Sequence, residues 1–489
     1  MGQNEELVWQ KTIGGSGDDK LSDVVIDASG YVYSIGSIQD NKGYESLDIF
    51  VSKETVGGQQ LWSRKIGESG NDIGISLLIN TDGNVVLLTS SNSSSGIFSS
   101  NLGKEDIYLI TLNSATGSLL NHLHFGGDSY DIPSSFIQNS TGNYVVYSHT
   151  RSETLDTEEI YGQFDLWVFE TTVSGEVVWQ RNYGGSDEDY SVDIIEHSNG
   201  EYILLGNSVS YDHDLTGLNY GDFDIVLLTI DYTGNLIDKS NYGGLAADYG
   251  AGLIELNNGN LVITGNTFST GIDIGQNAGF SDAWTFELNS TNNIIWEETF
   301  GGEGSEYTST ITQDFAGNIV IAGTTNSKNI KGNVVEGKQN VWLTTISNEH
   351  TFESIHIIGG AQFDEVADIV FTNTDEFILA GATNATSSIV HELNGRTDGW
   401  LTKLRYNNNP SASLDISAYP NPSNDLFYIN GLDIDDQISI VSNQGKLVQS
   451  DLPSNGFSKI LDLNNFPSGV YYMEIVRGKE VQQLKLVKL

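Results

Sequence analysis

The chain has 489 residues, a formal net charge of −43 and no cysteine. Its negative charge disfavours nucleic acids and anionic lipids as ligands, and the lack of cysteine excludes disulfides and thiolate metal sites. No apolar run is long enough for a membrane-spanning helix, so no transmembrane segment is expected. The first residues lack the basic and apolar regions of a signal peptide, so an exported form is expected to be the mature one.

Most of the chain consists of one unit that is repeated about every 58 residues. Each copy begins with a Gly-Gly pair, or once with Gly-Glu, and the first glycines are Gly14, Gly67, Gly126, Gly184, Gly243, Gly301 and Gly359. An acid follows five residues after each of them, at Asp19, Asp72, Asp131, Asp189, Asp248, Glu306 and Asp364. Matches at fixed offsets indicate copies of one structural unit.

Each unit is expected to contain four β-strands, here called a to d. In the fourth copy they span 191–196, 202–205, 224–230 and 236–242, with turns rich in glycine and asparagine between them. Seven such units favour an all-β fold, a seven-bladed β-propeller over residues 1–405. An open β-solenoid is the alternative, but a unit of this length is long for one solenoid coil.

The two ends of this region each lack part of a unit. Residues 7–11 read as a lone d strand, whereas the last copy ends after its c strand, near Leu404. We therefore expect the strand at 7–11 to complete the last blade. Such closure would tie the ends together and remove an exposed sheet edge.

The connections between strands b and c are long, as in 207–223 and 266–281, whereas the turns on the opposite face are short. Long loops on a rigid scaffold commonly carry binding sites. Side chains alternate between the two faces of a strand. Regular alternation along strand a would place the seven acids on the same face as a row of polar residues that lines the central channel of the propeller. The acids would then form a ring around the mouth of that channel. Carboxylates in that arrangement would suit calcium. The alternative is that each acid accepts backbone N–H bonds in the turn between blades.

Other groups point less clearly to a site. The acids that open the c strands, such as Asp106 and Asp165, are expected to hold turns, and Asp212-His213-Asp214 only faintly resembles a cluster of oxygen ligands. The histidines lack metal-ligand spacing, and the tryptophans at repeat positions fit packing better than sugar stacking. No catalytic motif is found, so a non-enzymatic protein is expected. Paired carboxylates of a glycosidase are the alternative.

The composition changes after a polar linker at 406–418, and the short strands predicted in 419–489 suit a small β-sandwich. This segment contains Tyr-Pro-Asn-Pro from 419, Asn-Gln-Gly-Lys from 443, Phe-Pro-Ser-Gly-Val-Tyr-Tyr from 466 and a final Lys-Leu-Val-Lys-Leu. It resembles the type A sorting domain of the Bacteroidetes type IX secretion system. The residues expected to carry the sorting signal are Tyr419, Pro420, Asn421, Pro422, Gly469, Tyr471, Lys485 and Lys488.

This resemblance implies export, passage through an outer-membrane translocon, cleavage of the domain and attachment to surface lipopolysaccharide. The implied partners are the type IX translocon, an outer-membrane shuttle protein and a sortase-like peptidase. The repeats resemble bacterial propeller repeats that imply the fold but no activity. We therefore expect a secreted, outer-membrane-associated surface protein, an adhesin or a receptor for a glycan or protein. The alternatives are an extracellular carbohydrate-active enzyme and a structural component of surface motility or secretion machinery.

Overall fold

The computed structural model describes residues 5–39, 46–155, 160–335, 337–373, 375–384, 393, 395–406, 417–419, 423, 426–432, 437–442, 446–452, 457–464, 466–477 and 480–489. Within these residues the protein is all-β, with two single-turn 3-10 helices, η1 (Gly96–Phe98) and η2 (His213–Leu215). The chain forms two compact units, Glu6–Arg405 and Tyr406–Leu489. No helix in the described residues is long and apolar enough to cross a membrane.

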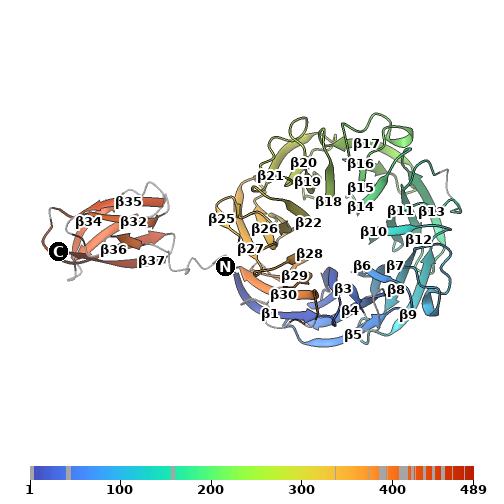
Figure 1. Cartoon of the computed structure of the whole chain (residues 1–489), viewed down its shortest axis with the longest axis horizontal. Coiled ribbons are helices and arrows are strands. Elements are labelled where there is room, and N and C mark those ends of the chain that lie inside the picture. Colours follow the sequence, from blue (N-terminus) through green and yellow to red (C-terminus); the bar gives the residue numbers. More distant parts are fainter. Residues whose placement is uncertain are drawn as a thin grey trace. The chain divides into compact units, whose positions relative to one another are not determined.

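The larger unit contains seven four-stranded antiparallel sheets in its described residues, and the sheets are arranged in a ring (Figure 1). The first three sheets are β2 (Lys20–Ile26), β3 (Tyr31–Gln39), β4 (Leu47–Thr55) and β5 (Gln60–Ile66); β6 (Asp72–Ile79), β7 (Val85–Ser91), β8 (Asp106–Leu112) and β9 (Leu119–Phe125); and β10 (Asp131–Gln138), β11 (Tyr144–Thr150), β12 (Asp165–Thr171) and β13 (Val177–Tyr183).

The next three sheets follow the same order from the inside of the ring outward. They are β14 (Asp189–Glu196), β15 (Tyr202–Ser208), β16 (Asp224–Ile230) and β17 (Leu236–Tyr242); β18 (Asp248–Glu255), β19 (Leu261–Thr267), β20 (Asp282–Leu288) and β21 (Ile294–Phe300); and β22 (Glu306–Gln313), β23 (Ile319–Thr325), β26 (Asn340–Ile346) and β27 (Phe352–Ile358). A small hairpin of β24 (Asn329–Ile330) and β25 (Asn333–Val334) stands in the loop between β23 and β26.

The remaining sheet combines strands from both ends of this unit. Its order is β28 (Asp364–Phe371), β29 (Glu376–Thr383), β30 (Asp398–Tyr406) and β1 (Glu5–Ile13), so the N-terminal strand lies beside β30 (Figure 1). The Thr402 hydroxyl donates to the carbonyl of Trp9 at 3.2 Å, and the Trp400 ring nitrogen donates to Gln10 at 3.4 Å. The first and last strands of the unit therefore share one sheet.

The middle strands of each sheet are buried on both faces, which explains their nearly continuous apolar sequences. In β16, for example, every residue from Asp224 to Ile230 is buried. The core lies between neighbouring sheets, where Leu204 and Val226 of one sheet join Tyr147 and Val168 of the previous one in a single cluster. Burial of this apolar surface is the main force that holds one sheet against the next.

The innermost strands are not regular. In each of them the pairing with the second strand skips one residue, and in β14 this β-bulge lies between Ser191 and Asp193. A bulge reverses the alternation of side chains beyond it. Asp193 therefore shares a face with Tyr190, whereas Asp189 shares the opposite face with Ile194.

The smaller unit consists of two antiparallel sheets. One contains β31 (Ser417–Tyr419), β32 (Leu426–Leu432) and β35 (Phe457–Asp462), and the other has the order β34 (Leu447–Leu452), β33 (Gln437–Ser442), β36 (Gly469–Arg477) and β37 (Glu480–Lys488). Buried residues from both sheets, including Phe427 and Ile440, form one apolar cluster. This cluster is the core of the unit.

Candidate functional site

The seven acids of the repeat stand at the start of the innermost strands, and each is at most 1% exposed. One carboxylate oxygen of each accepts a hydrogen bond of 2.7–2.8 Å from the backbone N–H four residues earlier. In five sheets the other oxygen accepts a hydroxyl from the end of the second strand, in the pairs Ser91–Asp72, Thr150–Asp131, Ser208–Asp189, Thr325–Glu306 and Thr383–Asp364. These contacts fit the structural alternative for the acids.

The expectation that these acids share a face with the polar row four residues later is wrong, because the bulge intervenes. The residue two positions after each acid precedes the bulge and does share its face. The acids lie between sheets, and the position four residues later holds the polar side chains that follow the bulge. Among the described residues, no three His, Cys, Asp or Glu side chains form a ready-made metal-binding group. A metal role for Asp19 and its six counterparts stays a prediction.

The polar row after the bulge forms hydrogen bonds between neighbouring innermost strands. The Ser76 hydroxyl donates to Asp23 at 2.6 Å, and the Thr310 hydroxyl donates to Asp368 at 2.8 Å. Asp23 and Asp368 also hydrogen-bond each other across the seam between the first and last sheets. Burial raises the pKa of both carboxyl groups, and the charge of Asp23 raises that of Asp368 further.

The residue after each acid points to the other face of the strand, because side chains alternate before the bulge. This position, which the sequence analysis did not single out, holds Lys20, Ile73, Ile132, Tyr190, Tyr249, Tyr307 and Glu365. It lies at the end of each sheet where strand a begins, strand b ends and strand c begins. All three points belong to the face that carries the long loops, here called the long-loop face. The repeat therefore varies at the surface that is best placed to meet a ligand.

Aromatic side chains gather on part of this face. The ring of Tyr190 lies 5.6 Å from Phe164 and 5.7 Å from Phe223, and Phe223 lies 5.2 Å from Tyr249. Phe268 continues the contacts, and Phe280 ends them with a ring that is 71% exposed. We call this set the aromatic belt: Phe164, Tyr190, Phe223, Tyr249, Phe268 and Phe280.

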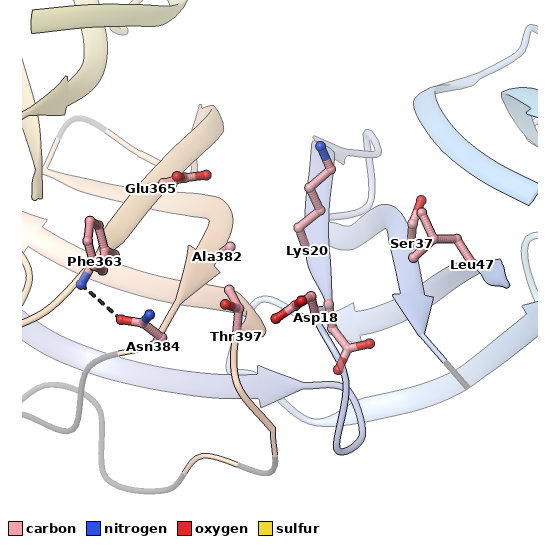
Figure 2. A pocket seen from close by; sticks show the side chains of 10 residues that line it. Asp18, Lys20, Ser37, Leu47, Phe363, Glu365, Ala382, Asn384 and Thr397 are labelled. Carbon is pink, nitrogen blue, oxygen red and sulfur yellow. Dashed lines mark hydrogen bonds between the residues drawn. The ribbon is translucent and has the colours of Figure 1, made fainter. Parts of the chain in front are cut away.

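On the same face a pocket of about 390 Å³ opens at the seam between the first and last sheets (Figure 2). Phe363 and Glu365 line one side, and Lys20 and Leu47 line the other. The backbone N–H of Phe363 donates to the side chain of Asn384 at 2.9 Å, which fixes that wall. Lys20 and Glu365 stand where the belt has tyrosines, so the pocket opens where the repeat lacks an aromatic ring.

The Asp212-His213-Asp214 segment forms no ligand cluster. Asp212 accepts the N–H of Ser186 at 2.8 Å, and His213 stacks on Tyr161 with ring centres 4.1 Å apart. The tryptophans pack between sheets, as Trp62 shows where it contacts Gly117 in the turn of the next sheet. Neither group supplies a site in this structure.

The predicted sorting residues fall partly within the described residues. Pro420, Asn421 and Pro422 lie outside them, and Tyr419 ends β31. The Tyr471 hydroxyl donates to the carbonyl of Pro467 at 2.6 Å, in the segment that leads into β36 at Gly469. Lys485 and Lys488 both lie in β37.

Lys488 is the most buried of the charged sorting residues that the structure describes. It is 7% exposed, and its Nζ donates to three backbone carbonyls in the segment before β36. Ser423 also pairs with Lys488, so the chain just after the Tyr-Pro-Asn-Pro motif runs beside the C-terminal strand. The motifs of this segment thus meet within one small β unit.

The fold and its two units define an all-β protein with a propeller-like body and a separate C-terminal β unit. Residues 417–489 match the family described as the secretion system C-terminal sorting domain. The resemblance to the type IX sorting domain is thereby confirmed. The type IX secretion machinery recognises such a tail, which indicates secretion and attachment to the cell surface.

No curated protein sequence matches the chain. Among solved structures, the GH93 α-L-arabinofuranosidase of Fusarium graminearum is similar at 10% identity and a TM-score of 0.42, over 81% of this chain and 98% of that one. The PQQ-bound aldose sugar dehydrogenase of Streptomyces coelicolor gives 11% and 0.36, over 82% and 97%. A puromycin hydrolase mutant gives 8% and 0.47, over 86% and 60%. Likeness at this level carries no argument about activity.

Proposed function

We propose that the protein is a secreted, non-enzymatic binding module whose seven sheets are the blades of a closed seven-bladed β-propeller. The propeller would span residues 1–405, the linker 406–418 and the sorting β-sandwich 419–489. The ligand would bind on the long-loop face. A rigid ring of sheets that presents variable loops on one face is a common design for binding without catalysis.

The observation that carries this proposal is the asymmetry of the long-loop face. The sheets keep the same buried contacts around the ring, yet the position after each acid changes from tyrosine in three sheets to Lys20 and Glu365 at the seam. A purely structural repeat has no need for a pocket and an aromatic belt on the same face. Its volume, about 390 Å³, falls in the range of small-ligand sites.

The chemistry of this face favours a neutral glycan or a protein segment with apolar and basic groups. Exposed aromatic rings such as Phe280 and Phe363, which is 41% exposed, can stack on sugar rings or pack against apolar side chains. The net charge of −43 repels anionic polysaccharides. Lys20 and Glu365 supply one donor and one acceptor group at the pocket.

Export would follow the type IX route. We propose that the C-terminal unit engages the type IX translocon, an outer-membrane shuttle protein and a sortase-like peptidase, and that the body then stays associated with the outer membrane. Deletion of residues 417–489 in the native host should leave the protein in the periplasm, as measured by fractionation and by surface labelling of intact cells. Unchanged surface labelling would contradict this route.

The binding proposal is tested with the purified full chain on an array of neutral, acidic and basic glycans. We expect binding to neutral glycans that falls at least roughly tenfold in Phe363→Ala, because a buried aromatic contact of this kind is worth more than 1 kcal/mol. Phe315→Ala is the matched control, because Phe315 is 65% exposed in a short turn on the opposite face.

Other outcomes identify the alternatives. Release of sugar from a bound glycan would show a carbohydrate-active enzyme, and Glu365→Gln would then be expected to abolish it. Failure to bind any glycan, together with co-purification with outer-membrane complexes, would favour a structural component of motility or secretion machinery. Equal loss in Phe363→Ala and Phe315→Ala would remove the long-loop face as the site.

A further inference from the structure

The residues at the end of strand b divide the long-loop face into two halves. The position that differs between the halves lies 25 residues after the first glycine of each repeat. Four repeats carry an amide side chain at this position, and the residues are Asn326, Asn384, Gln39 and Asn92. These are the sixth, seventh, first and second repeats, which follow one another around the ring (Figure 1). We call the four residues the amide arc. The other three repeats, on the side of the aromatic belt, carry Arg151, Val209 and Phe268.

Each amide of the arc is held in one orientation. Its oxygen accepts the backbone N–H that lies four residues after the first glycine of its own repeat, at 2.6–3.1 Å: Asp18 donates to Gln39, Asn71 to Asn92, Ser305 to Asn326 and Phe363 to Asn384. Because only the oxygen of an amide can accept, the NH2 group must point away from the backbone that is capped. No hydrogen bond from any of the four NH2 groups is found among the described residues. The arc thus holds a set of oriented donors at the surface.

Capping of the backbone would by itself explain these amides, but the fold does not require it. In both halves the backbone N–H at this position donates to the carbonyl of the equivalent partner, at 3.0 Å from Asn92 to Asn71 and at 2.9 Å from Arg151 to Tyr130. The same backbone junction therefore forms with an amide or with another side chain. The amides follow one half of the surface and not the repeat, as expected of a binding site on a repeated scaffold.

Three amides of the arc line two hollows that adjoin each other. Asn384 stands in the wall of the pocket at the seam (Figure 2). Gln39 and Asn92 line a second hollow of about 660 Å³, where the first repeat meets the second. Asp18 and Leu47 line both hollows, so the two share a wall. Together they form a groove that is longer than the pocket alone.

The fourth amide, Asn326, lines a third hollow of about 720 Å³ at the other end of the arc. This hollow lies where the fifth repeat meets the sixth, beside Gly301 and Lys331. It shares none of its described lining residues with the pocket at the seam. The continuous groove therefore runs from Asn384 to Asn92, and Asn326 lies beyond its end.

The chemistry of the groove favours a sugar chain over a peptide. Amide NH2 groups donate to oxygen, and a glycan offers ring and glycosidic oxygens that only accept, besides hydroxyl groups that do both. An extended peptide commonly binds by adding a strand to an open sheet edge. Here the backbone N–H groups of Gly70 and Asn71 are already bonded to side chains, so the groove offers no such edge. The carboxylate of Asp18 is paired with Arg396 at 2.5 Å, which leaves the shared wall suited to a neutral ligand.

We propose that this half of the long-loop face binds a linear neutral glycan of several sugar units. The chain would lie in the groove from Asn384 past Gln39 to Asn92, and the three NH2 groups would donate to successive sugar units. Phe363 would stack on the unit in the pocket, and Asn326 would contact longer chains only. This inference rests on the proposed function, because it takes a glycan as the ligand and the pocket as one end of the groove.

The length of the bound chain is tested by titrating the full chain with neutral oligosaccharides of glucose, xylose, mannose or galactose, from a single sugar to about six units. We expect the affinity to rise roughly two- to tenfold with each added unit up to about four units, because each unit gains hydrogen bonds, and then to level off. An affinity that does not change with length would overturn the groove but leave the pocket and the proposed function in place. Absence of binding to every oligosaccharide and on the glycan array would overturn both.

The role of the NH2 groups is tested by Asn92→Asp, which keeps an oxygen for the N–H of Asn71 but removes the donor. The Tm should stay as in the wild type, whereas the affinity for the longest oligosaccharide should fall roughly fivefold or more. In Gln39→Glu the loss should begin at a shorter chain, because Gln39 lies nearer to the pocket. Asn258→Asp is the matched control, because Asn258 is exposed in an a-to-b turn on the opposite face and its oxygen caps the N–H of Asn260 at 2.9 Å. Equal affinities in wild type, Asn92→Asp and Gln39→Glu at every length would show that the amides only cap the backbone, and would overturn the proposal.

Discussion

The ammonium group of Lys488 donates a hydrogen bond of 2.6 Å to the backbone carbonyl of Leu463. The same group reaches the carbonyls of Asn464 at 3.2 Å and Phe466 at 2.7 Å. All three acceptors lie between β35 and β36, so the side chain fixes this connection against the C-terminal strand. The lysine of the final Lys-Leu-Val-Lys-Leu motif is thus a structural part of the sorting unit.

Lys488→Met keeps most of the apolar stem but leaves these carbonyls without their donor. We expect the sorting unit to lose roughly 2–4 kcal/mol of stability, because several buried acceptors become unsatisfied at once. Limited proteolysis of the full chain should show faster cleavage within 417–489. Lys446→Met is the control, because Lys446 is exposed, and an equal cleavage rate in both variants would contradict the role of Lys488.

The contact between β1 and β30 predicts that the first strand is needed for the stability of the larger unit. Removal of residues 1–13 would expose the edge of β30 and delete Trp9, whose ring nitrogen donates to the carbonyl of Val56 at 3.0 Å. We expect Tm to fall by roughly 5 °C or more and soluble oligomers to form through the open edge. A chain without only residues 1–4 should behave as the intact protein in calorimetry and size-exclusion chromatography.

The order and type of the strands could be read from the sequence, because each repeat shows the same signals at the same offsets. The strand expected at 236–242 is β17, and the strand expected at 224–230 is β16. The predicted strand bounds were wrong at strand ends that no turn residue marks. The strand expected at 202–205 continues to Ser208 in β15, because its last residues still pair with β16.

The bulge in the innermost strands could not be predicted. The skipped residue is Ser134 in one repeat and Val192 in another, so no residue type marks it. Without the bulge, simple alternation puts the acid and the polar row on one face, and the acids are then taken for a ring at the channel mouth. The pocket and the aromatic belt were missed for the same reason. The signal that could have revealed them is the variation at the single position after each acid.

The buried acids predict an unusual pH dependence. Burial, opposed by the bonds from Ser208 and Gly185, raises the pKa of Asp189 to about 7, and burial raises that of Asp165 to about 6. A raised pKa in the folded state means that the folded protein holds protons that the unfolded chain has released. This contribution to stability is complete below the unfolded pKa of about 3.9 and is lost as the pH rises through about 7.

We therefore expect the free energy of unfolding, measured in a chelator, to fall between pH 4 and 8. Asp189→Asn should make that decline shallower, by up to about 1.4 kcal/mol for each unit of pKa shift that is removed. Asp231→Asn is the control. Its backbone bond from Asn235 lowers the pKa of Asp231, so its contribution changes only in acid. A decline that is the same in wild type and Asp189→Asn would contradict the role of this carboxyl group.

Close contact between Gly301 and two acids predicts that this glycine tolerates no side chain. A Cβ atom at Gly301 would lie 2.0 Å from Asp282 Oδ1 and 2.7 Å from Glu306 Oε2, well inside van der Waals contact. Gly301→Ala should therefore cost roughly 2–3 kcal/mol in urea unfolding. Gly57→Ala is the control, because the nearest atom to its Cβ would be the Thr55 hydroxyl at 3.8 Å.

A second substitution separates this contact from a general effect of alanine on the turn. Asp282→Ala removes the oxygen that lies nearest to the new methyl group, so the double variant should be more stable than the sum of the two single losses predicts. The expected coupling is about 1 kcal/mol or more, as is usual for residues in direct contact. If the two losses simply add, then the glycine is required for the backbone of the turn and not for the room that its missing side chain leaves to the acids.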